Sequence, residues 1–258
     1  MLILLPPSEG KRAPRRGAPL DLATLGFPSL TAAREQVLDA LVALCRDDPD
    51  KAAATLGVPS SQLDLVDHNA GLRTAPTARA DRVYAGVLYE AFDVATLSPG
   101  AKRRANRRLA VTSSLFGLVG PADRIPAYRL SGDAVLPGVG RIAGLWREHL
   151  GPAVDAALDG LLVDLRSSTY AAFWRPPAGL ADRVATVRVL HEVGGRRQVV
   201  SHFNKATKGR LVRALLEAGA EPRTPAQLAD ALRDLGWTIE SAAPTRRGTQ
   251  LDVVVAEL

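Results

Sequence analysis

The chain has 258 residues, of which 47% are hydrophobic and 23% charged, so it can bury a full core and we expect a globular protein. Residues 1–5 are too few for the apolar region of a signal peptide, and no stretch approaches the roughly 18 apolar residues of a membrane span, which predicts a cytosolic protein without a membrane partner. A net charge of +6 and a pI near 9.9 favour anionic partners.

The cysteine and histidine content gives no sign of a metal site. The single Cys45 cannot form an intrachain disulfide bond, and the four histidines are scattered at positions 68, 149, 191 and 202 without the ligand spacing of zinc. An iron site is disfavoured for the same reason, because no group of His, Cys and carboxylate residues has a recognisable spacing. We therefore expect no metal, no cofactor and a monomer.

The first predicted elements lie in the N-terminal quarter of the chain. The apolar residues 1–5 predict a buried strand that ends at Pro6 and Pro7. The Pro- and Arg-rich segment from Lys11 to Pro19 is predicted to be a mobile loop. An amphipathic helix is expected over residues 31–45, with Cys45 in its buried face.

Short apolar runs with strand character then alternate with helical patterns. The predicted strands are residues 108–112, 160–165, 184–190, 198–201 and 251–256. The clearest predicted helices are residues 141–158 and 207–218. This alternation predicts an α/β protein in which helices flank a central mixed β-sheet, and one compact domain over residues 1–258.

The start of a C-terminal helix carries the strongest local signal. Thr224 has the character of an N-cap, Pro225 stands at the first helical position, and Gln227 is where a capping box requires it. Gly236 is the expected stop.

Three of the predicted strands run into loops that combine hydroxyl groups with cations. Leu5 is followed by "PPSEGKR", Leu165 by "RSSTY" and Val200 by "SHFNKATKGR". Since the carboxyl ends of parallel strands meet at one sheet edge, these side chains are expected to converge there. Backbone N–H groups, serine hydroxyls and cations together suit a phosphate. The alternative for the first loop is an ordinary solvated turn.

The helical phase of the third loop adds to this prediction. A helix from Lys205 onward buries a stripe centred near Leu215, and we expect Lys205 and Lys208 on that stripe. Arg210 and Arg213 are expected on the opposite, solvated side. Buried lysines in a first turn cost desolvation and oppose the helix dipole unless an anion meets them. That anion is either a ligand or an internal carboxylate, for which the candidates are Glu9 and Asp164.

These observations predict one anion site at the carboxyl edge of the sheet. Its expected members are Ser8, Lys11, Arg129, Ser168, Lys205 and Lys208. The candidates for proton transfer or catalysis are Glu9, Tyr128 and Lys205.

A separate cluster of cations, "KRRANRR", contains no aromatic residue. Its cations are Lys102, Arg103, Arg104, Arg107 and Arg108. Such a cluster suits contacts with the phosphate backbone of nucleic acid and does not suit base stacking. A solvated loop is the alternative.

Six motifs together resemble one protein family. They are "MLILLPPSEGK", "DRVYAGVLYE", "SSLFGLVGPADRIPAYRL", "LWREHL", "VDLRSSTY" and "VSHFNKATKGRLVRALLE". In this order they resemble the YaaA family of bacterial peroxide-stress proteins, over nearly the whole chain. The resemblance implies a single-domain α/β fold described as cantaloupe-like, a cytosolic location and a role in limiting oxidative damage when peroxide and free iron rise. It also implies binding of double-stranded DNA through a positively charged cleft, and it carries over no catalytic residue.

Two places depart from the better-known members of that family. Their opening motif usually reads Ser-Pro-Ala-Lys, whereas here the lysine is displaced to Lys11 behind Pro6 and Pro7. Their Phe-Trp-Gly segment corresponds to Trp146 followed by Arg147. Ligand or DNA preference can therefore differ within the family.

The family's reported link to a helix-hairpin-helix draws attention to "LPGVGRIAGLW". In that DNA-binding motif the N–H groups of two glycines, here Gly138 and Gly140, hold a phosphate. A complete motif also needs a helix before the hairpin, yet the preceding "AYRLSGDAV" is turn-like. The alternative is a tight turn that starts the following helix.

Two functions therefore compete. The first is a stress protein that grips the phosphates of double-stranded DNA without sequence specificity. The second is an enzyme or binding protein for a small phosphorylated or nucleotide-like ligand at the strand-end loops. Exposed cations favour the first function, and inward-facing lysines beside Ser8 and Ser168 favour the second.

Overall fold

A mixed β-sheet of eight strands forms the centre of the molecule. The computed structural model describes residues 1–193, 196–199 and 201–255. Along the sheet the strands are β11 (Thr238–Ser241), β12 (Thr249–Val255), β9 (Val184–Val193), β8 (Leu162–Asp164), β1 (Leu2–Leu5), β3 (Leu109–Ser113) and β4 (Gly117–Val119), and β10 (Arg196–Gln198) pairs with β9. The pairs from β12 through β3 are parallel, and β11, β10 and β4 are antiparallel to their neighbours.

Ten helices surround this sheet in the described residues. They are α1 (Thr31–Asp47), α2 (Pro49–Leu56), α3 (Asp64–Ala70), α4 (Ala80–Val83), α5 (Val87–Phe92), α6 (Pro99–Arg108), α7 (Ile142–Ala157), α8 (Ser168–Ala171), α9 (Ser201–Ala218) and α10 (Pro225–Asp234). Two small antiparallel ribbons join β2 (Ala78–Arg79) to β5 (Arg124–Ile125) and β6 (Val135–Leu136) to β7 (Gly140–Arg141). The structure thus confirms an α/β domain with a mixed central sheet.

Strand β1 lies in the middle of the sheet because its sequence is apolar on both faces. Leu2, Ile3, Leu4 and Leu5 are all at most 3% exposed. A strand buried on both faces reads as a continuous apolar run, as parallel strands between helix layers do. The strand ends where Pro6 and Pro7 remove the backbone donors that a ladder needs.

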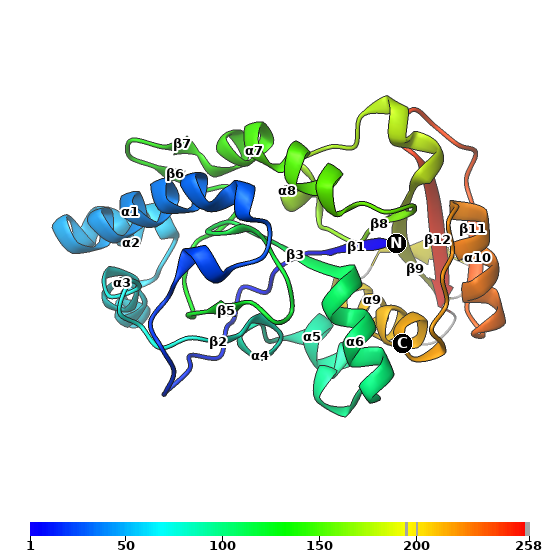
Figure 1. The fold of residues 1–258 in the computed structure, drawn as a ribbon, viewed down its shortest axis with the longest axis horizontal. Coiled ribbons are helices and arrows are strands. Elements are labelled where there is room, and N and C mark those ends of the chain that lie inside the picture. Colours follow the sequence, from blue (N-terminus) through cyan, green and yellow to red (C-terminus); the bar gives the residue numbers. More distant parts are fainter. Residues whose placement is uncertain (194–195, 200, 256–258) are drawn as a thin grey trace.

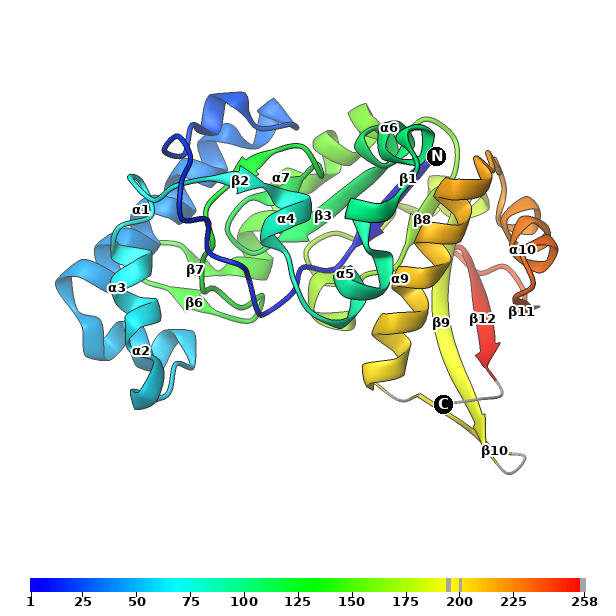
Figure 2. The same ribbon diagram turned by 90° about the horizontal axis from the view of Figure 1, so that it is seen from below.

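The helices form two layers and a separate end. Figure 1 shows α7 and α8 on one side of the sheet and α5, α6 and α9 on the other, with α1, α2 and α3 grouped at the far end of the molecule beside the β6–β7 ribbon. Figure 2, turned by 90°, shows α9 crossing the strands next to α5.

Helices α5 and α9 lie in very close contact, and one glycine makes this possible. A Cβ atom at Gly209 of α9 would collide with the carbonyl oxygen of Leu88 and would lie 2.9 Å from the backbone nitrogen of Phe92. Only a residue without a side chain allows the two backbones to approach this closely. The neighbouring Lys208 is thereby held against the sheet.

Most of the predicted elements are present, with shifted ends. Helix α1 begins at Thr31 as expected, with Cys45 2% exposed, and α10 begins with the expected cap, in which Gln227 N donates to Thr224 Oγ1 at 3.2 Å. The strand expected at 198–201 is wrong, since β10 ends at Gln198 and α9 begins at Ser201, while residue 200 lies outside the description. The helix expected at 207–218 therefore starts six residues earlier, and residue 256 of the last expected strand is also outside the description.

The segment predicted to be a mobile loop is tied to the molecule at both ends. Arg12 N donates to the Val83 carbonyl at 2.8 Å, and Thr77 N and Oγ1 both donate to the Ala18 carbonyl, at 3.0 and 2.8 Å. Among the described residues no helix is long and apolar enough to cross a membrane.

Candidate functional site at the carboxyl edge of the sheet

Three neighbouring parallel strands end at the same edge, and each delivers polar groups there. Strand β1 leads into Pro6, β3 ends at Ser113, and Leu165, after β8, donates its N–H to the Leu4 carbonyl at 2.9 Å. The expected convergence of the loops after Leu5 and Leu165 is therefore present. The end of β3, which sequence reasoning did not include, joins them.

The turn after β1 folds around Ser8. Its Oγ donates to the Gly10 carbonyl at 2.6 Å and accepts from Ala85 N at 3.0 Å. This hydroxyl was expected to bind an anion, yet in the structure it joins the turn to the segment before α5. Residue 11 then pairs with Tyr84 through a backbone bridge.

Lys11 is a partly exposed lysine whose direct hydrogen-bond and ring contacts are all with uncharged groups. Its Nζ donates to the carbonyls of Ser8 at 3.0 Å and Glu9 at 3.4 Å, and it lies 4.1 Å from the centroid of the Tyr128 ring. Burial, together with the nearby charge of Arg129, lowers the pKa of Lys11 to about 7, and Glu9 opposes this shift only in part. Lys11 therefore loses its proton more readily near neutral pH than an ordinary lysine does.

All four tyrosines of the sequence belong to this edge or its surroundings. The Tyr128 hydroxyl lies 2.8 Å from Ser113 Oγ and 3.1 Å from the Tyr84 hydroxyl. Tyr89 stacks on Tyr84 with a centroid separation of 5.4 Å and donates to the Pro6 carbonyl at 2.7 Å. Burial raises the pKa of each tyrosine, Tyr170 on α8 included, so all four phenols are neutral donors at physiological pH.

Sequence reasoning selected Tyr128 and missed Tyr84 and Tyr89. The two missed residues stand five positions apart in "DRVYAGVLYE", a motif noted only for its resemblance to a family. Their meeting depends on the path from α4 into α5. The one sequence feature that could have drawn attention to them is that two of the four tyrosines in the chain, Tyr84 and Tyr89, lie within six residues.

Arg129 carries a buried donor that is not used. Its guanidinium donates from Nη1 to Glu9 Oε2 at 2.7 Å, but Nε is buried and has no hydrogen-bond partner in the described residues. Asn69 fixes the backbone of Arg129 by donating from Nδ2 to its carbonyl at 2.7 Å and accepting from its N–H at 3.0 Å. Lys11 and Arg129 thus face one carboxylate, Glu9, whose side chain is 74% exposed.

Lys208 meets the end of β8. It is 9% exposed, and its Nζ donates to the Leu165 carbonyl at 3.1 Å. Burial lowers the pKa of Lys208, and the charge of Asp164 opposes that shift. Asp164 itself forms a two-pronged ion pair with Arg166, with Nη2 to Oδ2 at 2.7 Å and Nε to Oδ1 at 2.9 Å. The internal carboxylate proposed as an alternative therefore exists, although its direct partner is Arg166.

Lys205 and Ser168 do not join the buried part of the site. Lys205 is exposed, contrary to the expectation that it shares the buried stripe. At 100° per residue Lys208 lies about 20° from the direction of Leu215, whereas Lys205 lies about 80° away, at the flank of the stripe. Arg213, expected to face solvent, instead donates to the carbonyls of Phe92 and Asp93 at 3.2 and 2.9 Å. Ser168 is exposed in the first turn of α8.

Comparison with known proteins places this geometry in a family. The sequence profile described as "Peroxide stress protein YaaA" matches residues 1–243. The chain belongs to the YaaA family of peroxide stress proteins. It is 52% identical to a UPF0246 protein of Streptomyces coelicolor over 261 aligned positions that cover both chains in full. It is 43% identical to a UPF0246 protein of Corynebacterium efficiens, over 93% of this chain and 95% of the relative, and 27% identical to an uncharacterized protein of Campylobacter jejuni, over 82% and 83%.

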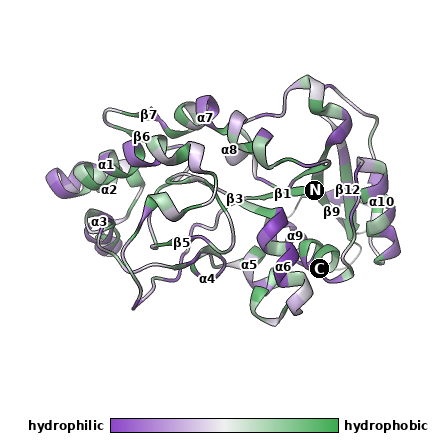
Figure 3. Cartoon of the chain, in the orientation of Figure 1, coloured by the Kyte–Doolittle hydropathy of each residue, from purple (hydrophilic) through white to green (hydrophobic). Residues whose placement is uncertain are grey.

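The basic cluster of this YaaA-family chain is a helix, and part of it is structural. Helix α6 is among the most hydrophilic elements in Figure 3. Arg104 Nε donates to the Leu216 carbonyl at 2.7 Å, Arg108 Nη1 donates to the Ala220 carbonyl at 2.9 Å and its Nη2 binds the Glu221 carboxylate, and Lys102 Nζ donates to the Ala95 carbonyl at 2.7 Å. Arg103 and Arg107 are exposed and have no such partner in the described chain.

The hairpin that suggested a helix-hairpin-helix is a β-ribbon. Val135 and Leu136 pair with Arg141 and Gly140, and the preceding described residues 126–134 contain no helix, so the expected motif is absent from this part of the chain. Gly138 and Gly140 have φ values of 73° and 81°, which the turn requires and glycine adopts without strain. The alternative, a tight turn before the next helix, fits the structure.

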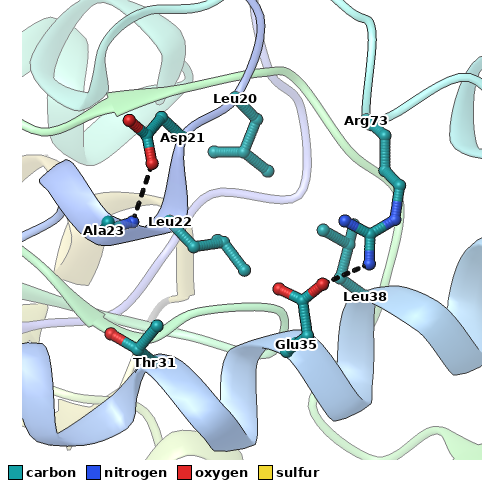
Figure 4. A pocket seen from close by; sticks show the side chains of 8 residues that line it. All are labelled: Leu20, Asp21, Leu22, Ala23, Thr31, Glu35, Leu38 and Arg73. Carbon is teal, nitrogen blue, oxygen red and sulfur yellow. Dashed lines mark hydrogen bonds and ion pairs between the residues drawn. The ribbon is translucent and has the colours of Figure 1, made fainter.

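Two surface pockets lie away from the strand edge. The first, of about 370 Å³, contains Arg73, whose guanidinium donates to Glu35 at 2.5 Å and also binds Asp39, and Figure 4 shows how Arg73 and Glu35 meet over α1. The second lies between the end of α7 and residues 177–183. Neither pocket includes Lys11 or Lys208. In the described residues no three His, Cys, Asp or Glu side chains are grouped to hold a metal ion.

Proposed function

We propose that this protein acts in the peroxide stress response by binding the phosphate backbone of double-stranded DNA through a face built from the loop after β1, α4 and α6. The observation that carries the proposal is a set of exposed arginines without carboxylate partners in the described chain. They are Arg12, Arg15, Arg16, Arg82, Arg103 and Arg107.

The segments that carry these arginines lie beside one another. Residue 12 bonds to the end of α4 through the Val83 carbonyl, and Arg79, which precedes α4, donates to Asn106 Oδ1 of α6 at 3.1 Å. Figure 2 shows the N-terminal loop, α4 and α6 along one side of the molecule. Unpaired cations spread over such a face favour backbone contact by counterion release, without base readout.

The salt dependence of DNA affinity tests this proposal. Each phosphate contact contributes about −0.9 to the slope of log K against log salt, so Arg103→Ala/Arg107→Ala is expected to flatten the slope by roughly 1.8. The matched control is Arg46→Ala/Lys51→Ala, which removes the same charge from exposed positions on α1 and α2. Equal slopes for wild type and the α6 variant, or an equal change in the control, contradict the proposal.

A second candidate function rests on the strand edge. We propose that this edge also binds a small phosphorylated or nucleotide-like ligand, because Lys11 and Arg129 face one largely exposed carboxylate and the buried Nε of Arg129 lacks an acceptor. An anion supplies that acceptor and offsets the charge.

Thermal melts against phosphate, nucleotides and nucleosides test the second candidate. A ligand at a hundredfold excess over its dissociation constant adds about 2.7 kcal/mol to the free energy of unfolding. The shift is expected to disappear in Arg129→Ala and to persist in Lys205→Ala, whose lysine is exposed. A panel without any shift, or a shift that survives in Arg129→Ala, contradicts this candidate.

A further inference from the structure

Lysine is scarce in this protein, and its placement is uneven. The sequence contains 33 lysine and arginine residues, of which only five are lysines, at positions 11, 51, 102, 205 and 208. Lys51, Lys102 and Lys205 are exposed, whereas Lys208 is buried and Lys11 half-buried beside the ends of β8 and β1. Arginine stays protonated in proteins, so among the cationic side chains only the lysines can present a neutral primary amine. The α-amino group of Met1, whose pKa burial lowers from 8.0, is a further amine that the trapping experiment must map separately.

Lys11 is placed to react and Lys208 is not. Lys208 lies under the sheet edge near the Asp164–Arg166 ion pair, and Asp164 favours its charged form. Lys11 has the cation Arg129 as neighbour, aromatic rings on one side and partial exposure to solvent. Its two hydrogen bonds, to the carbonyls of Ser8 and Glu9, need only the two N–H groups that a neutral amine retains.

The groups around Lys11 match what an amine needs to attack a carbonyl compound. The Arg129 guanidinium, whose charge acts on Lys11 and whose buried Nε–H has no acceptor among the described residues, supplies a positive partner for an acidic group of the ligand. Glu9, bound to the same guanidinium, is exposed and can move protons. The Ser113–Tyr128–Tyr84 hydroxyl chain keeps the Tyr128 ring in place against Lys11.

We propose that the ε-amino group of Lys11 forms an imine with a small aldehyde or ketone that carries an anionic group. The lone pair of the neutral amine attacks the carbonyl carbon, the carbonyl π pair moves to oxygen, and one of the two amine protons passes to that oxygen to give a carbinolamine. The nitrogen then loses its one remaining proton as the carbon–oxygen bond breaks, and this proton and the hydroxyl group leave as one water for each imine formed. The inference rests on the second proposed function, ligand binding at the strand edge, and extends it to the substrate class.

Reductive trapping tests the inference with pyruvate and glyoxylate as probes. Each probe is incubated with the full chain at pH 7 and borohydride, and the adduct is located by peptide mass mapping. We expect modification of Lys11 at least about tenfold faster than of Lys51, because at pH 7 about half of an amine with a pKa of 7 is neutral and less than about 0.1% of an ordinary lysine is. Lys11→Arg is expected to lose the adduct, and the matched control Lys208→Arg to keep it.

The outcomes separate the two proposals. A melting shift with either probe but no adduct at Lys11 overturns the imine and leaves ligand binding intact. No shift and no adduct overturns the imine and counts against this class of ligand at the edge. Labelling spread evenly over Lys11, Lys51, Lys102 and Lys205 also overturns it. Since the mapping is done on wild type, the result does not depend on the folding of Lys11→Arg.

Discussion

One lysine lies beside the end of β1 and another beside the end of β8, and the two differ in which charged groups face them. At the end of β8 the carboxylate of Asp164 is 9% exposed and binds Arg166, so Lys208 sits beside an internal ion pair. Near the end of β1 the charge of Arg129 lowers the pKa of Lys11, and the carboxylate of Glu9 is largely exposed to solvent. At the end of β8 the buried charges pair with one another, whereas near the end of β1 a net positive charge and the unpaired Nε–H of Arg129 remain. Burial alone therefore does not decide whether a lysine is structural; its charged neighbours do.

The largest expected effect comes from breaking the buried Asp164–Arg166 ion pair at the end of β8. Arg166→Ala is expected to lower the free energy of unfolding by about 3–5 kcal/mol, because it leaves Asp164 buried without a partner. It also removes donors to the carbonyls of Tyr170 and Trp174. Chemical denaturation measures the change. The matched variant Arg129→Ala breaks a pair whose carboxylate is 74% exposed, and it is expected to cost less than about 1 kcal/mol because Glu9 remains in contact with water. Similar losses of unfolding free energy in Arg166→Ala and Arg129→Ala argue against a difference between the two strand ends.

The next effect tests how α9 is held where Lys208 meets β8. Gly209→Ala is expected to destabilise by about 1–3 kcal/mol, since the new methyl group collides with the α5 backbone. Gly144→Ala, in the first turn of α7 with only the Arg141 side chain near, is the control and is expected to be neutral or stabilising by up to about 1 kcal/mol. If both substitutions are neutral, the close contact of α5 and α9 is not what fixes Lys208.

A pH series sharpens the contrast between the two lysines. The pKa of Lys11 is about 7 in the folded protein and its ordinary value is 10.5, so between these values the unfolded chain binds one more proton and stability rises with pH. Below pH 7 the penalty is complete, and Lys11→Met removes it.

We therefore expect Lys11→Met to gain stability over wild type by at least about 1 kcal/mol more at pH 6 than at pH 10, since each pKa unit corresponds to about 1.4 kcal/mol. Lys208→Met is the comparison variant and is expected to show a smaller pH dependence, because Asp164 compensates its lysine. Urea unfolding at each pH measures both. If the stability gain of Lys11→Met does not change with pH, or changes less than that of Lys208→Met, the proposed difference between the two lysines is wrong.

The smallest effect concerns the cations that face neither strand end. Arg103→Ala/Arg107→Ala is expected to change the free energy of unfolding by no more than about 0.5 kcal/mol, as exposed substitutions usually do. Arg104→Ala on the same helix is expected to cost about 1 kcal/mol because it removes the donor to the Leu216 carbonyl of α9. Thermal unfolding measures the stability of both variants. An equal loss of stability in the two contradicts the assignment of Arg104 as structural and of Arg103 and Arg107 as free surface cations.

Local patterns in the sequence predicted the elements well, and side-chain convergence less well. Helix α10 followed from Thr224, Pro225 and Gln227 because a cap is decided by residues three apart, and β1 followed from a run of apolar residues. The position of Lys205 was wrong because a residue about 80° from the direction of Leu215, at the flank of the helix, was assigned to the buried stripe.

The meeting of the loops after β1 and β8 was predicted, and most of the side chains that meet there were missed. Lys208 reaches the end of β8 from helix α9 and not from a strand-end loop. The partners of Lys11 came from residues 84, 128 and 129, whose positions depend on tertiary folding. No sequence spacing indicates that Tyr84 meets Tyr128. Likewise, the five cations of "KRRANRR" were one cluster in sequence, and only contact with α9 divides them.

The central position of β1 has a consequence for how the chain folds. Ile3 is in register with Leu109 on one side and Val163 on the other, so β1 pairs only with strands that lie more than 100 residues further along the chain. Contacts of such sequence separation slow folding, because loop closure is unfavourable until the strands meet. During synthesis at about 5–20 residues per second, β1 stays unpaired for several seconds after it leaves the ribosome. Until β3 and β8 have emerged, this run of leucine and isoleucine is an unpaired apolar segment, and such segments favour aggregation of the nascent chain.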